Sequence, residues 1–193
     1  MIETVAGIVQ KILTHPLDEF RRLRNEDTQS LARYFLILLS INAILSALVS
    51  LAGLGALNLI RRTMHIPHPL FIFFLVLLGG LIITPLFAAW LHLWIIAIGG
   101  KAGFSQTIKA VMYGNTPGLL FGWIPVIGIF FYFWSLVLVI FGVYELHQIE
   151  GDRAAFAVIL AVIVPVVILA IIASLFFFGG LIAVIPVARA IVP

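Results

Sequence analysis

The sequence contains no cysteine and little charge, since only 10% of its 193 residues are Asp, Glu, Lys or Arg. The missing cysteine excludes disulfides, thiolate metal sites and cysteine nucleophiles. The net charge of +3 is small and scattered, which is not typical of nucleic-acid binding. Hydrophobic residues make up 63% of the chain, against about 45–50% in soluble domains. A soluble core of this size cannot bury so much apolar surface, so the sequence predicts an integral membrane protein.

Long runs without charge predict the membrane spans. A helix needs about 20 mostly apolar residues to cross the bilayer, and the charge-free runs are 34–60, 63–100, 110–144 and 154–188. Gly122, Pro125 and Gly128 interrupt the third run and predict a tight turn between two spans. We therefore expect an all-α, polytopic transmembrane bundle of five spans over 30–178, between a cytoplasmic segment, 1–29, and a short extracytoplasmic tail, 179–193. A re-entrant third–fourth hairpin stays open.

The positions of Lys and Arg predict the orientation. With five spans, eight of these residues fall on the side of the N-terminus and three on the other side. Positive residues concentrate on the cytoplasmic side of membrane proteins. We therefore expect a multi-pass protein of the cytoplasmic membrane with its N-terminus inside and its C-terminus outside.

The first 29 residues carry an amphipathic pattern. Apolar residues recur at helical spacing, Pro16 divides the segment, and basic residues follow it. Such a segment beside a first span is typical of a helix that lies on the lipid headgroups. The predicted membrane-surface residues are Ile2, Val5, Val9, Ile12, Leu17, Phe20, Arg21, Arg22 and Arg24. A docking site for a soluble partner is the alternative.

His92 is an ionisable residue inside a predicted span, which makes it a functional candidate. It could carry protons, bind an ion, or form a hydrogen bond with a neighbouring helix as a neutral imidazole. The predicted spans contain no Asp or Glu. That composition favours the packing interpretation over ion coupling.

The third predicted span contains the densest polar group, Tyr113, Asn115 and Thr116, just before Pro117. Proline has no N–H, so the Tyr113 carbonyl loses its usual helical partner. Asn115 and Thr116 can compensate locally. Alternatively, the opened backbone forms a hinge or binding point within the bundle.

Sequence motifs give no support for an enzyme. The chain has no Gly-x-Ser-x-Gly, His-Glu-x-x-His or phosphate-binding loop. The segment 144–153 combines acids with His147, but its spacing matches no established metal-ligand pattern. We therefore expect no catalytic residues, no cofactor and no metal.

The chain resembles the Ypt-interacting-protein (YIP) family of five-span membrane proteins. The resemblance covers about 16–178, and its motifs are His15-Pro16…Phe20, His92…Gly99-Gly100-Lys101-Ala102-Gly103-Phe104-Ser105-Gln106-Thr107, Tyr113…Thr116-Pro117, Ile124-Pro125…Ile127-Gly128, Trp134, Gly142 and Tyr144-Glu145-Leu146-His147. It implies five helices, a cytoplasmic N-terminus and no catalysis. Eukaryotic members bind Rab-type GTPases and act in membrane traffic, but this chain lacks their long cytoplasmic N-terminal domain. Its compact form is more similar to prokaryotic members.

The resemblance and the residues together predict a non-enzymatic membrane scaffold that acts through protein or lipid contacts on its cytoplasmic face. The expected partners are the lipid bilayer and other membrane or membrane-associated proteins, without nucleic acid, and pairs of small residues leave a homo-oligomer open. The alternative is a small transporter, a channel or an accessory subunit of a transport complex. The candidate packing or partner-facing residues are His92, Tyr113, Asn115, Thr116, Pro117, Pro125 and His147.

Overall fold

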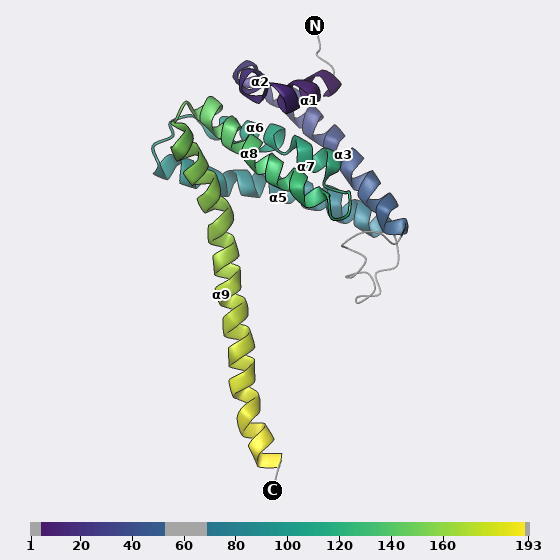
Figure 1. The fold of residues 1–193 in the computed structure, drawn as a ribbon, viewed down its shortest axis with the longest axis vertical. Coiled ribbons are helices and arrows are strands. Elements are labelled where there is room, and N and C mark those ends of the chain that lie inside the picture. Colours follow the sequence, from purple (N-terminus) through teal and green to yellow (C-terminus); the bar gives the residue numbers. More distant parts are fainter. Residues whose placement is uncertain (1–4, 53–68, 192–193) are drawn as a thin grey trace. The chain divides into compact units, whose positions relative to one another are not determined.

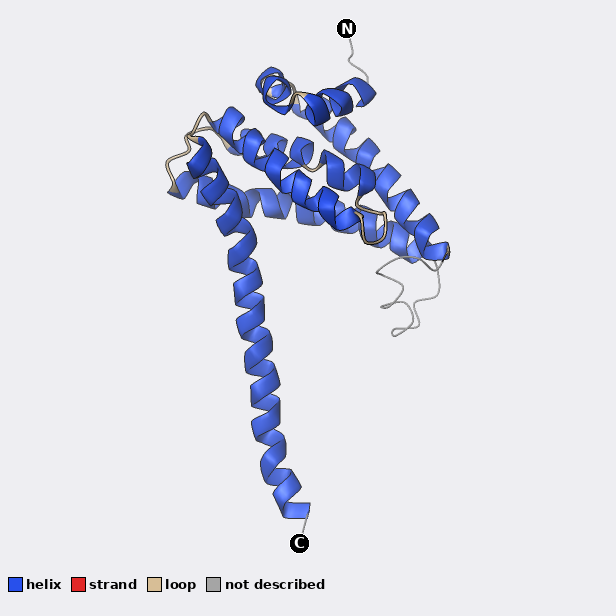
Figure 2. Cartoon of the chain, in the orientation of Figure 1, coloured by secondary structure: helices blue, strands red, loops and turns tan. Residues whose placement is uncertain are grey.

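The computed structural model describes residues 5–52 and 69–191, and these residues form helices and turns without strands (Figure 2). The helices are α1 (Val5–Thr14), α2 (Pro16–Leu23), α3 (Thr28–Leu51), α5 (Pro69–Ala97), α6 (Phe104–Gly114), α7 (Thr116–Phe121), α8 (Gly128–His147) and α9 (Gly151–Ile191), as labelled in Figure 1. The predicted all-α class is confirmed. The chain divides into two units, 1–158 and 159–193.

Four of the described helices are long and apolar enough to cross a membrane: Thr28–Leu51, Pro69–Ala97, Gly128–His147 and the Gly151–Phe176 part of α9. They correspond to the first, second, fourth and fifth predicted spans. The third predicted span is not one continuous helix, because α6 ends at Gly114 and α7 begins at Thr116. Pro117 explains the division, since proline cannot donate a helical hydrogen bond and restricts the residue before it.

The first unit is held together by close packing of α6 against α8. A Cβ atom added to Gly114 would lie 2.8 Å from the backbone nitrogen of Val139, so only glycine allows this approach. Farther along the same pair, a Cβ atom on Gly142 would lie 3.0 Å from Ala110. Helix α5 packs against α3 and α6, while α7 packs against α3 and α8. The apolar core includes Phe35, Leu38, Leu91, Leu138 and Val143.

The N-terminal helices α1 and α2 pack against each other, and α2 also packs against α8 (Figure 1). Pro16 stands in the first turn of α2, where its missing N–H costs nothing. Asp27 caps the start of α3, because its carboxylate accepts a hydrogen bond of 3.0 Å from the Ser30 N–H. Hydrogen bonds from the Ser30 hydroxyl and from its N–H hold the pKa of Asp27 below its usual value.

The second unit is the continuation of α9, which runs as a helix to Ile191. The fifth span was expected to close before Gly179, and the helix does not end there. A glycine inside a helix costs only about 1 kcal/mol relative to alanine, so it does not by itself end a helix. The side chains described in this unit include exposed Val166, Leu169 and Phe176.

Candidate functional site

Apolar contacts seat α2 on the bundle. Phe20 and Leu23 are fully buried, as is Ile12 of α1. The Phe20 ring lies over Gly142, where an added Cβ atom would be 3.0 Å from the ring. Burial of such a side chain is worth about 1.5–3 kcal/mol. The amphipathic pattern of the N-terminal segment therefore serves, at least on this face, to bind α2 to α8.

Lys109 of α6 holds the end of α2 through backbone carbonyls. Its Nζ donates to the carbonyl oxygens of Leu23 at 3.2 Å, Arg24 at 2.7 Å and Glu26 at 2.6 Å. The last carbonyls of a helix have no helical partner, and a buried cation satisfies them well. Lys109 is itself only 3% exposed. Its ammonium group therefore joins α6 to the connection between α2 and α3.

Polar side chains on both partners extend this contact. The Arg21 Nε donates to the Glu145 carboxylate of α8 at 2.8 Å, and the Arg24 side chain donates to the Glu145 carbonyl. The hydrogen bond between Arg21 and the Glu145 carboxylate, together with the negative charge of Glu145, raises the pKa of Arg21. The Gln106 amide of α6 donates to the Arg24 carbonyl at 3.2 Å. We call the contacts of α2 with Gln106, Lys109 and Glu145 the docking network.

A histidine–threonine–histidine cluster joins α5, α6 and α8. The Thr107 hydroxyl lies 2.7 Å from His92 Nδ1 and 2.9 Å from His147 Nε2. The two imidazole rings are 6.0 Å apart between centroids. Thr107 is fully buried, and His147 is buried as well. The fold therefore brings together two of the predicted site residues, His92 and His147, with Thr107 between them.

The hydrogen-bonding capacity of Thr107 orders the protons in this cluster. A hydroxyl has one hydrogen, so it donates to one imidazole and accepts from the other. His147 Nδ1 is buried and has no hydrogen-bond partner among the described residues. A buried N–H without an acceptor is more costly than a lone pair without a donor. The favoured arrangement therefore has His147 Nε2–H donating to Thr107, which donates to His92 Nδ1.

A second polar cluster surrounds the break between α6 and α7. The Thr116 hydroxyl donates to the Tyr113 carbonyl at 2.5 Å, which replaces the hydrogen bond that Pro117 cannot make. Because the threonine hydrogen is used, the Tyr34 hydroxyl donates to Thr116, at 2.7 Å. The Tyr34 and Tyr113 rings lie 4.9 Å apart. The break is therefore repaired by side chains that also fasten α3 to it.

Short polar contacts complete this region. The Asn42 amide of α3 donates to the Leu119 carbonyl at 2.8 Å, and the Gly118 N–H donates to Ser135 of α8 at 2.8 Å. Asn115 lies between α6 and α7 and lines a cavity of about 260 Å³ together with Thr84 and Ser135. No group of three metal-ligating side chains occurs within the described ranges.

Comparison with known proteins identifies the family. A family model described as the Yip1 domain matches residues 11–174, which includes α2, the docking network and both polar clusters. The chain belongs to the Yip1 domain family. No curated protein and no solved structure matches it. The family is one of non-enzymatic membrane proteins, and the predicted YIP membership is confirmed.

The predicted packing or partner-facing residues of the Yip1 domain lie in separate regions. His92 and His147 share Thr107, whereas Tyr113, Thr116 and Pro117 are buried around the break. Asn115 lines the neighbouring cavity. Pro125 is exposed in the turn between α7 and α8. These residues therefore do not form one site.

The predicted membrane-surface residues also divide. Ile2 lies outside the described residues, and Ile12 and Phe20 are fully buried within the protein. Val5 and Val9 are half-buried, and Leu17 is 38% exposed. Arg22 pairs with Glu19 on α2, while Arg21 and Arg24 bind Glu145. Among the described members, Leu17, Arg21 and Arg22 are exposed and available to a membrane surface.

Sequence reasoning missed the residues that dock α2. Lys109 entered the sequence analysis only in the count of positive residues, and Glu145 only as one of the acids of 144–153 and as part of the motif at 144–147. Thr107 and Tyr34 were not singled out as hydrogen-bonding residues. One signal was available: Lys109 is the single charge within 102–144, and a cation at such a position is expected to have a specific partner.

Proposed function

We propose that this Yip1 domain is a non-enzymatic membrane scaffold with five spans, α3, α5, α6–α7, α8 and α9. Its N-terminus lies in the cytoplasm and its C-terminus outside. The docking network supports this topology, because it gathers α2, the start of α6 and the end of α8. All three are expected on the cytoplasmic side from the distribution of Lys and Arg.

The observation that carries the scaffold role is the docked N-terminal segment. Buried Phe20 and Lys109 fix the inner face of α2 on α6 and α8, so its outer face is held in a defined position. That outer face presents Leu17 and Asp18, both exposed. A surface that is already ordered loses little conformational entropy on binding. It therefore suits contacts with proteins or lipids at the cytoplasmic face.

The two polar clusters support a scaffold over a transporter. His92, Tyr113 and Thr116 are engaged in packed contacts with Thr107 and Tyr34. The hydrogen-bond chain of the histidine cluster ends at His147 Nδ1, which has no partner within the described part of the chain. A proton path needs a continuing acceptor beyond that atom. These packed contacts therefore favour the scaffold over the alternative, a small transporter or channel.

Photo-crosslinking tests the scaffold role. A photoreactive amino acid at Leu17 or Asp18 should form a discrete protein or lipid adduct in native membranes, and the same residue at Ile163 of α9, also exposed, should not form that adduct. Lys109→Met should weaken it by releasing α2. Reconstituted protein should show no proton or cation flux above empty liposomes. A flux that His92→Ala abolishes in a folded protein would establish the transporter instead.

The topology has its own test. Reporter fusions at both chain ends should give an inside signal for the N-terminus and an outside signal for the C-terminus. Both ends on one side would refute the five-span arrangement while leaving the docking network intact.

A further inference from the structure

The turn between α7 and α8, residues 122–127, is apolar and unusually exposed. Val126 is 86% exposed, Ile127 is 54% exposed and Phe130, at the start of α8, is 68% exposed. No charged residue occurs anywhere from 110 to 144. A turn that emerges into water is normally rich in polar residues, and an exposed apolar patch marks an interaction surface.

The backbone of the turn is largely satisfied by its own carbonyls. Four N–H groups donate locally: Gly122 to Gly118, Ile124 to Phe121, Ile127 to Pro125, and Gly128 to Ile124. Pro125 has no N–H, and the Trp123 indole donates to the Leu120 carbonyl at 2.6 Å. Internal pairing of this kind is required of any backbone that enters a membrane.

Two N–H groups of the turn, those of Trp123 and Val126, donate to no backbone carbonyl among the described residues. In the bilayer centre each would be costly. At the boundary between acyl chains and glycerol, lipid ester carbonyls can accept them. The presence of Trp123 in the turn also indicates a position near the acyl–glycerol boundary, because tryptophan is enriched at membrane interfaces.

The length of α8 gives an independent estimate of how deep the α7–α8 turn lies in the bilayer. The Arg21–Glu145 pair belongs at the headgroups, since Arg21 is 65% exposed and an exposed charge is costly in hydrocarbon. Gly128 precedes Glu145 by 17 residues on α8, which is about 25 Å at the helical rise. The hydrocarbon layer is about 30 Å thick, and any tilt shortens the reach. The turn therefore stops short of the far headgroups.

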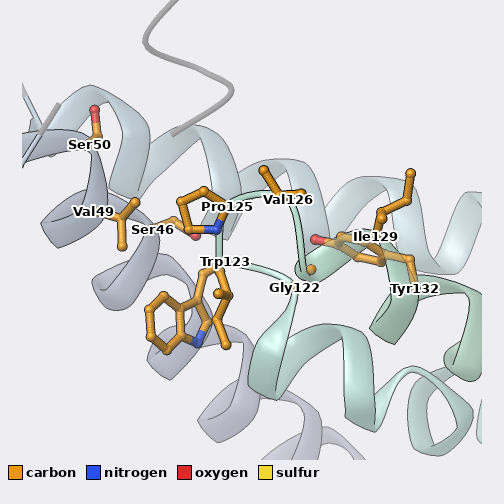
Figure 3. A pocket seen from close by; sticks show the side chains of 11 residues that line it. Ser46, Val49, Ser50, Gly122, Trp123, Pro125, Val126, Ile129 and Tyr132 are labelled. Atoms are coloured by element: carbon orange, nitrogen blue, oxygen red, sulfur yellow. The ribbon is translucent and has the colours of Figure 1, made fainter. Parts of the chain in front are cut away.

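A cavity of about 630 Å³ lies beside the turn (Figure 3). Trp123, Pro125 and Val126 line one side, and Ser46 and Val49 of α3 line the other. Its walls are mainly apolar, and none of the described residues that line it is charged. Lipid acyl chains match this lining and are the molecules present at that depth.

We propose that the α7–α8 turn ends within the far leaflet, at the acyl–glycerol boundary, and that phospholipid acyl chains cover Val126, Ile127 and the neighbouring cavity. In this form of the five-span topology, the α6–α7 and α8 spans cross the centre of the bilayer and end at the acyl–glycerol boundary of the far leaflet, so the turn between them presents no loop to water. This inference rests on the membrane topology proposed above but not on the scaffold role.

Spin labels test this contact, because the chain has no cysteine to remove. Single variants Val126→Cys and Ile127→Cys are labelled with a nitroxide and reconstituted in phosphatidylcholine liposomes. Phe133→Cys, on the exposed face of α8, is the control for acyl contact, and Lys101→Cys, in the exposed α5–α6 connection, is the control for water. Collisions with oxygen and with a water-soluble nickel chelate, present on both sides, are then measured.

The labels at 126 and 127 should resemble that at 133, with frequent oxygen collisions and at least several-fold fewer nickel collisions than at 101. Nickel access equal to that at 101 would place the turn in water and overturn the proposal. Low access to both reagents would mean that protein covers the turn, such as a second copy, and would overturn the lipid contact. Because both reagents reach both sides, neither outcome depends on the orientation that the reporter fusions test.

Discussion

The two ends of the first unit solve the same problem, unpaired backbone groups at helix ends, in opposite ways. At the α2 end, charged and polar side chains from distant parts of the sequence bind backbone carbonyls, as Lys109 does for Leu23, Arg24 and Glu26. At the α7–α8 turn, most backbone N–H groups donate to carbonyls of the turn itself, and the side chains exposed there are apolar. The first solution suits water and headgroups, and the second suits lipid.

The difference teaches that the polar residues of this Yip1 domain are used for docking and repair. Lys109 and Glu145 join α2 to the bundle, and Thr116 repairs the break at Pro117. At the α7–α8 turn, the backbone hydrogen bonds of the described residues join near neighbours in the sequence instead. Substitutions at the two ends should therefore have different consequences.

The largest loss of stability is expected from a substitution in the α6–α8 contact, which lies between the α2 end and the α7–α8 turn. Gly114→Ala places a Cβ atom 2.8 Å from the Val139 backbone nitrogen, so the helices must separate. We expect a loss of about 3 kcal/mol or more, measured by unfolding in mixed micelles. Gly79→Ala is the matched control, because nothing lies within 4 Å of its Cβ position. A tolerated Gly114→Ala would refute the close approach of α6 and α8.

Lys109→Met should have the next largest effect and should act at the α2 end. It removes three hydrogen bonds from a charged donor to carbonyls, of which the one to Leu23 is buried and the other two are partly buried. Hydrogen bonds to charged groups contribute about 1.5–3 kcal/mol, and we expect a loss of about 2–3 kcal/mol. Lys109→Arg should recover part of it. An unchanged melting temperature for Lys109→Met would remove the docking role of this residue.

Composition and the charge-free runs predicted the all-α membrane class and five spans, of which four are long apolar helices in the structure. The family was predicted from the motif resemblance. All of these depend on local sequence. The dependence of the break on Pro117 and its repair by Thr116 were also within reach, since they involve residues within four positions. The docking network was not, because Lys109 and Glu145 meet Arg24 only after folding. The burial of Phe20 could not be predicted either, because it depends on a contact with Gly142, which is distant in the sequence and has no side chain that would indicate a partner.

The histidine cluster should contribute less than Lys109. His92→Ala removes a hydrogen bond between helices, worth about 0.6–2 kcal/mol in membrane proteins. Thr107→Val should cost at least as much, since it removes both imidazole contacts. The double variant should lose less than the sum of the two. Strictly additive losses would show that the two residues are not coupled.

At the apolar end, one substitution should stabilise the protein. Val126 has a φ of 68°, a conformation that costs an L-residue about 1–2 kcal/mol. Val126→Gly relieves this strain and removes no core contact, so the melting temperature should rise slightly, by the equivalent of about 1 kcal/mol. The matched Ile127→Gly, at a φ of −70°, should not stabilise. A fall in both would contradict the strain at 126.

The smallest effect is expected for the Arg21–Glu145 pair, because Arg21 is 65% exposed. Such exposed pairs contribute little to stability and are screened by salt. A double-mutant cycle with Arg21→Gln and Glu145→Gln should show this coupling at low salt and its decrease at 1 M salt. A coupling that does not change with salt would place the pair away from water, against the contrast between the two ends.

Amide hydrogen exchange of α2 tests the docked N-terminal segment most directly. The wild-type protein in nanodiscs should protect the amides of Phe20–Leu23 about as well as those of the start of α6. In Lys109→Met the same amides should exchange at least tenfold faster, while Lys101→Met, a lysine in the exposed α5–α6 connection, should leave them unchanged. Exchange of wild-type α2 at the rate of a free peptide would contradict the docked segment and the scaffold surface built on it.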